Sequence, residues 1–367
     1  MGIFFDVERP DLSSGSKANP VTASLLALAM LFFFSARVPA QSNPSRAMPR
    51  PFQEITDETG RKVRVPEPVQ RIVSLAPSLT ETLYALGAED RLVGDTDFCD
   101  FPSAAQNKPK VRGAINPSLE EIVALHPDLV LVTKSLNRLE TVSALERLGI
   151  STYATDPRTV NDVLSSTARL AGVLGIPGAG RALAQDLQRR LADLRARLAA
   201  LPPRRVLFVV WTEPLISVGQ KTFIADAIRD AGGLSVVDAD QDWPQINLEE
   251  VIKLHPDFLV FASAHSELAL REFGAVVARP GWRDLDAVRH RRFAIISDAI
   301  NRPAPRLVSA IEDLARQLHP EAFSEDRSNG KESPAPAKPG PPFGNLNLLD
   351  TREVSQFLVL GRCACAH

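Results

Sequence analysis

The chain has 367 residues, a formal net charge of −2 and a sequence pI near 6.3. This length accommodates two domains, and the near-neutral charge argues against a nucleic-acid-binding protein with a basic surface. The three cysteines, of which Cys363 and Cys365 lie at the very end, are too few for a disulfide framework. No Cys or His spacing typical of a zinc site is present, so we expect neither a metal site nor a cofactor.

The first forty residues resemble an export signal. Residues 21–34 form an apolar run of 14 residues, which suits a signal peptide and is shorter than the ~20 residues that span a bilayer. Val38-Pro39-Ala40 places small residues before a cut after Ala40. Because the leader upstream is not basic, alternatives to a cleaved signal peptide over residues 1–40 stay open: the true start lies downstream, or the run stays as an uncleaved membrane anchor. A buried helix is the remaining interpretation of the run, and we favour over it an exported, periplasmic protein.

Residues 55–175 predict an α/β lobe that follows a Pro- and Ser-rich linker over residues 41–54. Short apolar runs alternate with amphipathic segments, which is typical of a parallel β-sheet covered by helices on both faces. Ser78 follows the expected strand 71–75, and Glu81 stands three positions later. This spacing predicts a capping box at the start of a helix that ends at Leu86.

The second half of the chain repeats this alternation after one long helix. In residues 176–203 the leucines recur at spacings of three and four, which predicts a helix linking two lobes. Strand and helix patterns then alternate over residues 204–322, the expected C-terminal lobe. Residues 323–367 are rich in Pro, Gly, Ser and Lys, and we expect a disordered tail.

A ten-residue segment occurs twice, beginning at Leu119 and at Leu248, with seven identical positions. We interpret the two copies as the same helix–turn–strand unit in two similar lobes. Ser118 and Asn247 precede the copies as expected helix caps, and Glu121 and Glu250 are placed to complete capping boxes. The preceding glutamates, Glu120 and Glu249, are not needed for the caps; they either favour the helix dipole or present a free carboxylate to a partner.

No catalytic motif is present, so we expect no enzymatic activity. Aromatic and charged residues gather instead in loops after predicted strands, where α/β folds bind ligands. These loops contain Phe98, Trp211 and Trp243, and the segment from Asp298 to Arg306.

These patterns resemble the cobalamin-binding branch of the iron-siderophore/cobalamin substrate-binding family of ABC importers. The resemblance covers residues 55–318 and includes short motifs in the family's order. These motifs are Arg71-Ile72-Val73-Ser74-Leu75-Ala76-Pro77-Ser78, Cys99-Asp100-Phe101-Pro102, Asn116-Pro117-Ser118-Leu119-Glu120, Trp243-Pro244-Gln245 and Arg302-Pro303-Ala304-Pro305-Arg306.

The resemblance implies a class III periplasmic binding protein fold: two lobes, each with a central parallel β-sheet flanked by helices, joined by one long backbone α-helix. It implies a monomer that binds cobalamin or a related corrinoid between the lobes and partners a permease dimer with its ATPase subunits. Glu120 and Glu249 would dock on the permease. The ligand-binding residues carried over or expected from the loops are Pro77, Ser78, Phe98, Trp211, Trp243, Asp298, Arg302 and Arg306.

One departure from the cobalamin binders keeps an alternative open. The chain has no tryptophan before Trp211, whereas close cobalamin binders carry tryptophans in the first lobe. A ferric siderophore or haem is therefore the alternative ligand, and Arg112, Arg158, Arg302 and Arg306 could hold an anionic chelate. A metallocluster enzyme on a similar frame would need more cysteines, and a sensor domain is the third alternative.

Overall fold

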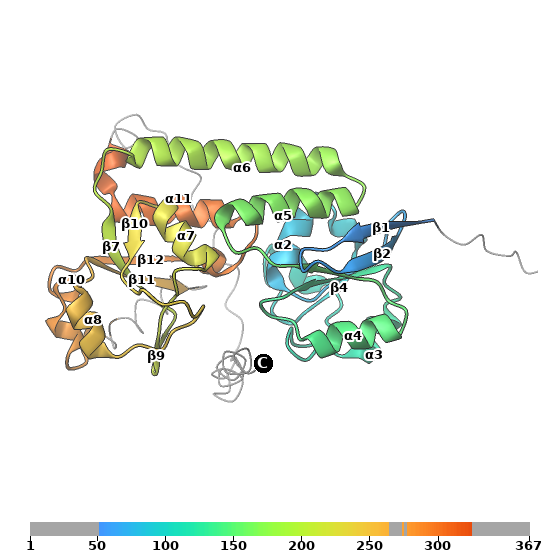
Figure 1. Ribbon diagram of the computed structural model, residues 1–367, viewed down its shortest axis with the longest axis horizontal. Coiled ribbons are helices and arrows are strands. Elements are labelled where there is room, and N and C mark those ends of the chain that lie inside the picture. The colour runs from blue at the N-terminus through green and yellow to red at the C-terminus, as the bar shows by residue number, and fades with distance from the viewer. Residues whose placement is uncertain (1–50, 264–273, 275–276, 325–367) are drawn as a thin grey trace, which may run out of the picture. The chain divides into compact units, whose positions relative to one another are not determined.

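The computed structural model describes residues 51–263, 274 and 277–324. In these residues, helix α6 (Pro177–Leu198) lies in sequence between two four-stranded parallel sheets (Figure 1). We call residues 51–176 the N-terminal lobe and the described residues of 199–324 the C-terminal lobe. The expected signal, residues 1–40, lies outside the described residues. Among the helices that are described, none combines the length and apolar character needed to cross a bilayer.

The N-terminal lobe alternates strands and helices along the chain as the sequence predicted. Its elements are β1 (Phe52–Thr56), β2 (Lys62–Pro66), β3 (Ile72–Ser74), α2 (Pro77–Ala85), β4 (Leu92–Asp95), α3 (Leu119–Ala124), β5 (Leu129–Thr133), α4 (Leu139–Arg147), β6 (Thr152–Thr155) and α5 (Val160–Val173). The sheet has the order β4-β3-β5-β6 with all neighbours parallel, and β1 pairs with β2 as an antiparallel hairpin. Because β1 already begins at Phe52, the strand includes the last residues of the expected linker.

Both faces of the N-terminal sheet are covered by helices. Leu129 and Leu131 of β5 pack in one core with α2 and α5, whereas Val130 and Val132 pack in another with α3 and α4. Successive side chains of a strand point to opposite faces, so a strand buried on both sides is apolar throughout. This is why the sequence shows continuous apolar runs here.

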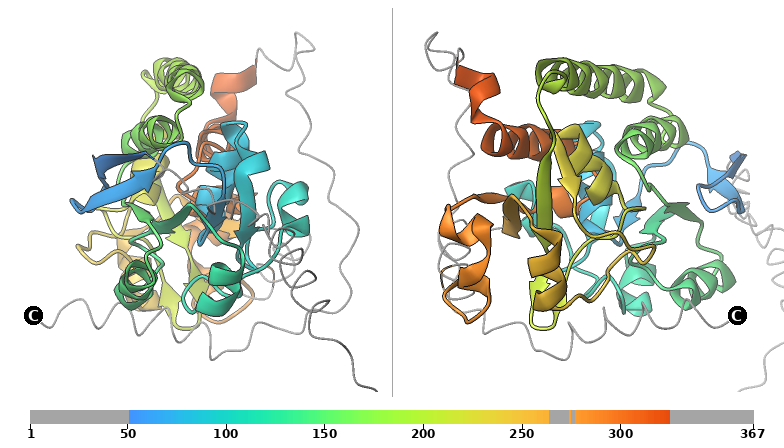
Figure 2. Two further views of the ribbon diagram at one scale, coloured as in Figure 1. Left: turned by 90° about the vertical axis from the view of Figure 1, so that its right-hand side faces the viewer. Right: turned by 60° about the vertical axis from the view of Figure 1, so that its left-hand side comes forward.

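The C-terminal lobe repeats the same topology. Its elements are β7 (Arg204–Val209), β8 (Trp211–Thr212), β9 (Leu215–Ile216), α7 (Phe223–Asp230), β10 (Gly233–Ser235), α8 (Leu248–Leu254), β11 (Phe258–Ser263), α10 (Asp286–Arg289), β12 (Phe293–Ser297) and α11 (Leu307–Leu318). The order β10-β7-β11-β12 equals that of the first sheet when β7 takes the place of β3. The duplicated segment thus corresponds to a duplicated strand order. Figure 2 shows the two lobes from two further sides. The sequence pattern over residues 268–278 also predicts a helix, and most of that range falls outside the described residues.

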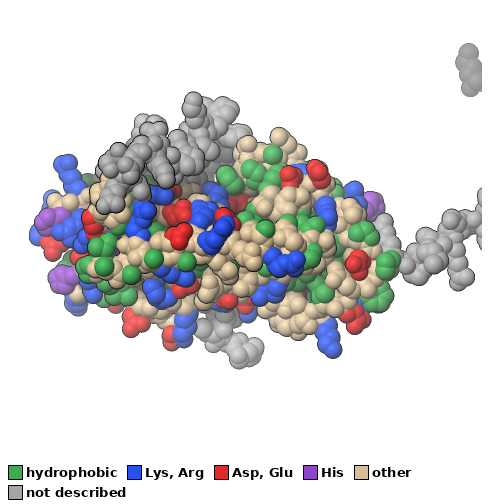
Figure 3. All heavy atoms as spheres, turned by 90° about the horizontal axis from the view of Figure 1, so that it is seen from above, with side chains coloured by type: hydrophobic (Ala, Val, Ile, Leu, Met, Phe, Trp, Pro, Cys, Tyr) green, Lys and Arg blue, Asp and Glu red, His purple; other side chains and the backbone are tan. Residues whose placement is uncertain are grey.

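Helix α6 packs against both lobes. It runs alongside α5, and Gly180 permits a close approach to Ala171 of that helix. Its leucines Leu187, Leu191, Leu194 and Leu198 join the core formed by α7 and α11. The opposite face of the helix carries acidic and basic side chains interspersed (Figure 3). The predicted linking helix is confirmed.

The predicted tail, residues 323–367, includes a residue of the C-terminal core. Phe323 is 8% exposed and packs in the C-terminal core. Its ring lies 4.9 Å from the guanidinium of Arg197 and 5.7 Å from that of Arg316. A Pro- and Gly-rich composition predicts disorder for a segment as a whole. It does not show whether one aromatic residue at the start of that segment packs in the core. Residues 325–367 lie outside the described residues.

Candidate functional site

The two copies of the repeated segment form helices α3 and α8, each capped by the expected residue. Ser118 Oγ accepts the N–H of Glu121 at 3.2 Å, and Asn247 Oδ1 accepts the N–H of Glu250 at 2.8 Å. At α8 the carboxylate of Glu250 accepts the N–H of Asn247 in return, at 3.0 Å. The capping box predicted for the second copy is therefore confirmed.

The box predicted for the first copy is wrong. The N–H of Ser118 donates to the carbonyl of Val111 at 3.0 Å, so it has no need of the Glu121 side chain. The carboxylate of Glu121 lies 3.4 Å from Arg112 Nε instead. Sequence spacing identifies a possible box, but a backbone carbonyl from a neighbouring loop can take the same donor.

Each copy is attached to its sheet in the same way. Asp128 accepts the N–H of Arg71 at 2.9 Å, and Asp257 accepts the N–H of Arg205 at 2.9 Å. The two arginines donate back to the ends of their helices, Arg71 to Leu125 O at 2.7 Å and Arg205 to Leu254 O at 2.6 Å. Such bonds satisfy carbonyls that a helix end leaves open. These reciprocal bonds hold α3 and α8 in equivalent positions beside their sheets.

Glu120 and Glu249 occupy equivalent positions in the first turns of α3 and α8. Both are exposed, and no ion pair of either is found within residues 51–263, 274 and 277–324. The neighbouring glutamates, Glu121 and Glu250, have partners of their own. The structure therefore leaves one free carboxylate in each lobe at matching places.

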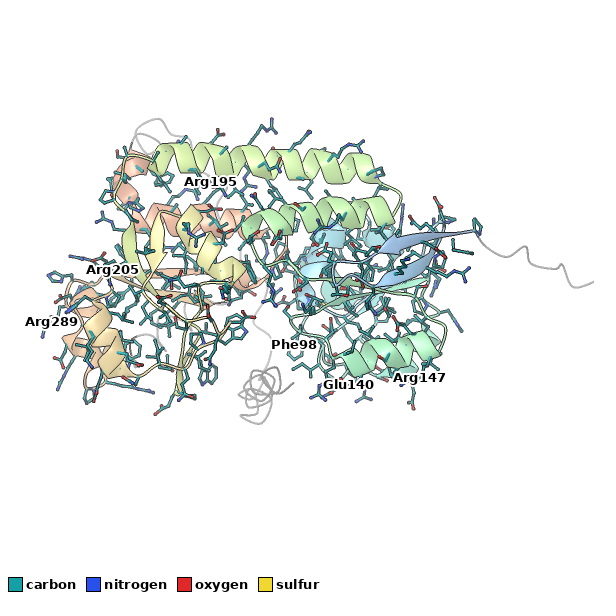
Figure 4. The ribbon with its side chains drawn as sticks, viewed as in Figure 1. Phe98, Glu140, Arg147, Arg195, Arg205 and Arg289 are labelled. Carbon is teal, nitrogen blue, oxygen red and sulfur yellow. The ribbon has the colours of Figure 1, made fainter. Side chains whose placement is uncertain are left out.

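Phe98 and Trp243 are exposed in loops, and Trp211 is exposed at the start of β8. Phe98 follows β4 and is 45% exposed, Trp211 follows β7 and is 39% exposed, and Trp243 precedes α8 and is 49% exposed. Phe101, in the same loop as Phe98, is 39% exposed. Figure 4 shows Phe98 projecting from its loop. Large aromatic side chains exposed on two lobes supply apolar faces for a ligand.

Strand β9 links the segments that contain Trp211 and Trp243 in the C-terminal lobe. Trp211 of β8 pairs with Ile216 of β9, and Ile216 forms an isolated bridge with Gln245. The indole N–H of Trp211 donates to Glu213 O at 2.8 Å. Ile216 thus pairs both with Trp211 and with a residue two positions after Trp243.

Arg302 and Arg306, predicted as ligand-binding residues, meet an acidic residue of the other lobe. Glu81 Oε1 accepts from Arg302 Nη1 and from Arg306 Nη2, both at 2.8 Å, and its Oε2 accepts from Arg306 Nε at 2.9 Å. Asp100 accepts from Arg302 Nη1 at 2.6 Å, and Asp298 lies 2.8 Å from Arg302 Nη2. We call Glu81, Asp100, Asp298, Arg302 and Arg306 the arginine cluster.

The arginine cluster is mostly buried. The Glu81 side chain is 2% exposed, those of Arg302 and Arg306 are 16% and 21% exposed, and that of Asp100 is 48% exposed. Burial alone would lower the pKa of Arg302, but its hydrogen bond with Asp100 and the charges of Asp298, Asp100 and Glu81 raise the pKa overall. The guanidinium of Arg306 also lies 3.9 Å from the centre of the Phe101 ring. Asp100 and Phe101 belong to a motif quoted from the sequence, which was a signal for their involvement.

The capping box predicted for Ser78 and Glu81 is therefore wrong. Helix α2 begins at Pro77, its N-cap is Ala76, and no side chain caps it. Pro needs no hydrogen bond in the first turn of a helix. Ser78 is buried, and Glu81 points into the arginine cluster rather than back to the helix start. The sequence spacing fits a capping box, but the Glu81 side chain contacts arginines of the C-terminal lobe instead.

A buried polar group fixes the loop that carries Phe98 and Phe101. The Cys99 thiol lies 3.2 Å from the hydroxyls of both Thr80 and Thr96, and burial raises its pKa. Beside it, Lys110 Nζ donates to fully buried Asp95 at 2.7 Å. Burial raises the pKa of Asp95 to about 6, although Lys110 opposes this shift. The two exposed aromatics therefore stand on an anchored loop.

A second link between the lobes involves Arg158. Its Nη1 donates to Asp242 at 2.8 Å, and its Nε lies 3.2 Å from Asp156. In addition, Asp226 of α7 accepts the N–H of Val160 at 2.8 Å. Arg158, which could have held an anionic chelate, is thus already paired with carboxylates of the protein. The side chain of Arg112, the other such arginine of the N-terminal lobe, is 71% exposed.

The N-terminal lobe also contains an acidic pocket of about 390 Å³, lined by Thr56, Asp57, Glu58, Asp156, Asp162 and Arg169. Its carboxylates are engaged by groups of the protein itself. Asp57 accepts from Arg61 at 2.7 Å, and Glu58 accepts from Arg169 at 3.0 Å and from the N–H of Asp156 at 3.0 Å. In the described part of the chain, no three His, Cys, Asp or Glu side chains are placed to hold a metal ion. We interpret this pocket as structural.

The comparisons with known proteins agree with this architecture. A family model described as periplasmic binding protein matches residues 72–299. The vitamin B12-binding protein of Vibrio vulnificus is 31% identical over 253 residues, which cover 68% of this chain and 90% of the relative. The crystal structure of the periplasmic vitamin B12-binding protein of Vibrio cholerae is 27% identical with a TM-score of 0.62, covering 70% of this chain and 99% of that one.

A haem-binding relative has the same fold. The periplasmic haem-binding protein from Roseiflexus sp. RS-1, in its apo form, is 25% identical with a TM-score of 0.63, covering 69% of this chain and 99% of that one. The predicted class III fold, two parallel α/β lobes joined by a long helix, is confirmed, and the chain belongs to the periplasmic binding protein family.

Proposed function

We propose that this protein is the exported substrate-binding protein of an ABC importer and that it carries cobalamin or a related corrinoid. The observation that supports this ligand most directly is the set of exposed aromatic side chains, Phe98 and Phe101 on one lobe and Trp211 and Trp243 on the other. A corrinoid is large and presents broad apolar faces, which aromatic rings cover well. The names of the Vibrio relatives point to the same ligand.

Delivery of the ligand would use the two free carboxylates. Glu120 and Glu249 lie on helices held in equivalent positions, so they form a pair that can meet two like sites. Arginines are the expected partners, because a guanidinium binds a carboxylate through two parallel hydrogen bonds. The partner of this surface is then the permease dimer, which acts with its ATPase subunits. A relative from Bacillus subtilis, 27% identical, is named as an ABC transporter substrate-binding lipoprotein.

In this proposal the protein binds, releases and performs no chemistry. It acts as a monomer in the periplasm, whether free or anchored by its leader. The loops of both lobes hold the ligand, and Pro77, Asp298 and the exposed aromatic residues contact it. Haem or a ferric siderophore is the alternative ligand, supported by the haem-binding relative from Roseiflexus.

Isothermal titration calorimetry of the purified protein tests the proposal. We expect cyanocobalamin to bind with a dissociation constant of micromolar or below. Absorption spectra of the protein as purified distinguish a corrinoid from haem or an iron chelate. If neither cobalamin nor cobinamide binds while haem or a ferric siderophore does, the alternative replaces the main proposal. Binding of none of these compounds rejects both.

A further inference from the structure

The arginines of the candidate site are already matched by carboxylates. In the arginine cluster, Arg302 and Arg306 face Glu81, Asp100 and Asp298, so three acidic groups surround two basic ones. Both oxygens of Glu81 are occupied, and Arg306 binds them with two nitrogens in a bidentate pair. An anionic ligand would therefore have to displace a buried carboxylate before it could bind these arginines.

Acidic residues also flank the exposed aromatics. Asp97 adjoins Phe98 and is exposed, Asp242 adjoins Trp243, and Glu213 follows Trp211 with a side chain that is 79% exposed. Asp242 shares Arg158 with Asp156, so that arginine too has more than one carboxylate. Glu213 is itself paired with Arg279 at 3.0 Å, and Asp242 with Arg158 at 2.8 Å. The basic side chains beside the aromatic residues, like Arg302 and Arg306, thus already have carboxylate partners within the protein, and an anionic ligand would compete with those partners.

We infer that Glu81 is a specificity-determining residue, which neutralises Arg302 and Arg306 and thereby excludes anionic iron chelates and haem in favour of a ligand without net negative charge. This inference rests on the proposed function, because it assigns the charge class of the ligand held there. Glu81 reaches the arginines from the opposite lobe, so the N-terminal lobe sets the charge available on the C-terminal lobe. Discrimination by an unfavourable charge is a general way to reject a competing ligand of similar size.

The experiment compares cyanocobalamin, which is neutral overall, with haem, whose propionates are negative. Dissociation constants for both are measured with the wild-type protein, Glu81→Gln and the control Glu58→Gln. Glu58 is a matched control: its side chain is 5% exposed and pairs with Arg169 at 3.0 Å, within the N-terminal lobe. In the wild type and Glu58→Gln we expect cyanocobalamin to bind more tightly than haem. In Glu81→Gln we expect the preference to fall about tenfold, since a freed arginine gains a charge-assisted bond with a propionate.

If folded Glu81→Gln keeps the wild-type preference for cyanocobalamin over haem, the inference is overturned and the proposed function stands. The same holds if the wild-type protein binds cobalamin but prefers haem. A wild-type protein that binds neither compound rejects the proposed function itself. Should Glu81→Gln fail to fold, Asp100→Asn provides the test, because that side chain is 48% exposed and also pairs with Arg302. It should lower the preference in the same direction by a smaller factor, and no change in it overturns the inference.

Discussion

Glu81 of helix α2 and Arg306 at the start of α11 form a bidentate ion pair between the two lobes, with N–O distances of 2.8 and 2.9 Å. They lie 225 positions apart in the sequence. The Glu81 carboxylate is almost fully buried, and its Oε1 also accepts a hydrogen bond from Arg302. The lobes are thus connected by charged side chains as well as by α6.

Removal of Glu81 should destabilise the protein strongly. Glu81→Ala leaves two mostly buried guanidinium groups without their shared partner, and we expect the free energy of unfolding to fall by about 3 kcal/mol or more. Urea denaturation followed by circular dichroism measures this change. The control is Glu146→Ala, because Glu146 pairs with Arg61 at 2.7 Å but is 50% exposed.

For the exposed pair of the control we expect a loss below about 1 kcal/mol. Equal losses for Glu81→Ala and Glu146→Ala would show that the arginine cluster contributes no more than a surface ion pair.

The two free glutamates should matter for transport and not for ligand affinity. We expect the double variant Glu120→Ala with Glu249→Ala to abolish uptake by proteoliposomes that contain the importer, while its dissociation constant for cyanocobalamin stays unchanged. The reason is that both side chains are exposed and unpaired among the described residues. Loss of ligand binding in the double variant would contradict the docking role.

Glu140→Ala is the control for the docking experiment. Glu140 is also an exposed glutamate in the first turn of a helix, α4 (Figure 4). Helix α4 lies outside the repeated segment, so Glu140 is not one of the paired positions. Uptake with this variant should equal that of the wild type. If it also stops uptake, the loss reflects surface charge in general and not a docking pair.

The fold could be predicted from the sequence because its signals are local. Apolar runs such as that of β5 mark strands buried on both faces, and the leucines of α6 recur at helical spacing. The duplicated segment identified two lobes with one topology. Strand β10 was missed, because it has only three residues directly after Gly232, where the sequence indicates just the end of a helix.

The site was predicted less completely because its contacts are not local. Arg302 and Arg306 were identified as site residues, but the partner that neutralises them, Glu81, was assigned to a helix cap. A glutamate three positions after the expected cap Ser78 fits either a capping box or a long-range ion pair, and only the contacts of Glu81 with Arg302 and Arg306 distinguish the two. Glu120 and Glu249 were singled out because local capping was expected to engage their neighbours. Glu250 does cap its helix, whereas Glu121 pairs with Arg112, and the docking role of Glu120 and Glu249 stays a prediction.

The exposed aromatics should carry much of the ligand affinity. Burying a large apolar side chain contributes about 1.5–3 kcal/mol, so Trp243→Ala and Phe98→Ala should each weaken cyanocobalamin binding by roughly 10- to 100-fold. Phe52→Ala is the control, because Phe52 is 48% exposed on β1 and stacks on Arg64 at 3.5 Å. Calorimetry measures all three, and wild-type affinity in the tryptophan variant would remove Trp243 from the binding surface.

Asp95 gives the stability a pH dependence of unusual sign. Burial raises its pKa from 3.8 to about 6 in the folded protein. The folded state therefore holds this proton more tightly than the unfolded state does, and the contribution of Asp95 to stability falls as pH rises from about 4 to about 6. A difference of about two pKa units corresponds to roughly 2–3 kcal/mol.

Asp57 should show the opposite dependence. Burial would raise its pKa, but hydrogen bonds from Thr59 and Arg61 outweigh burial and lower it below 3.8. Its contribution is present above pH 4 and is lost as the pH falls through the lowered pKa. The two carboxylates differ in their partners. Asp57 accepts from three backbone N–H groups and from the side chains of Thr59 and Arg61, whereas one oxygen of Asp95 has no partner among the described groups.

Urea denaturation of the wild type, Asp95→Asn and Asp57→Asn between pH 3 and 6.5 tests both assignments. The wild type minus Asp95→Asn difference in unfolding free energy should decrease as the pH rises from 4 to 6, since asparagine does not titrate. The wild type minus Asp57→Asn difference should be constant above pH 4 and decrease below it. A first difference that is flat or rises with pH would show that Lys110 outweighs burial and that Asp95 is ionised throughout this range.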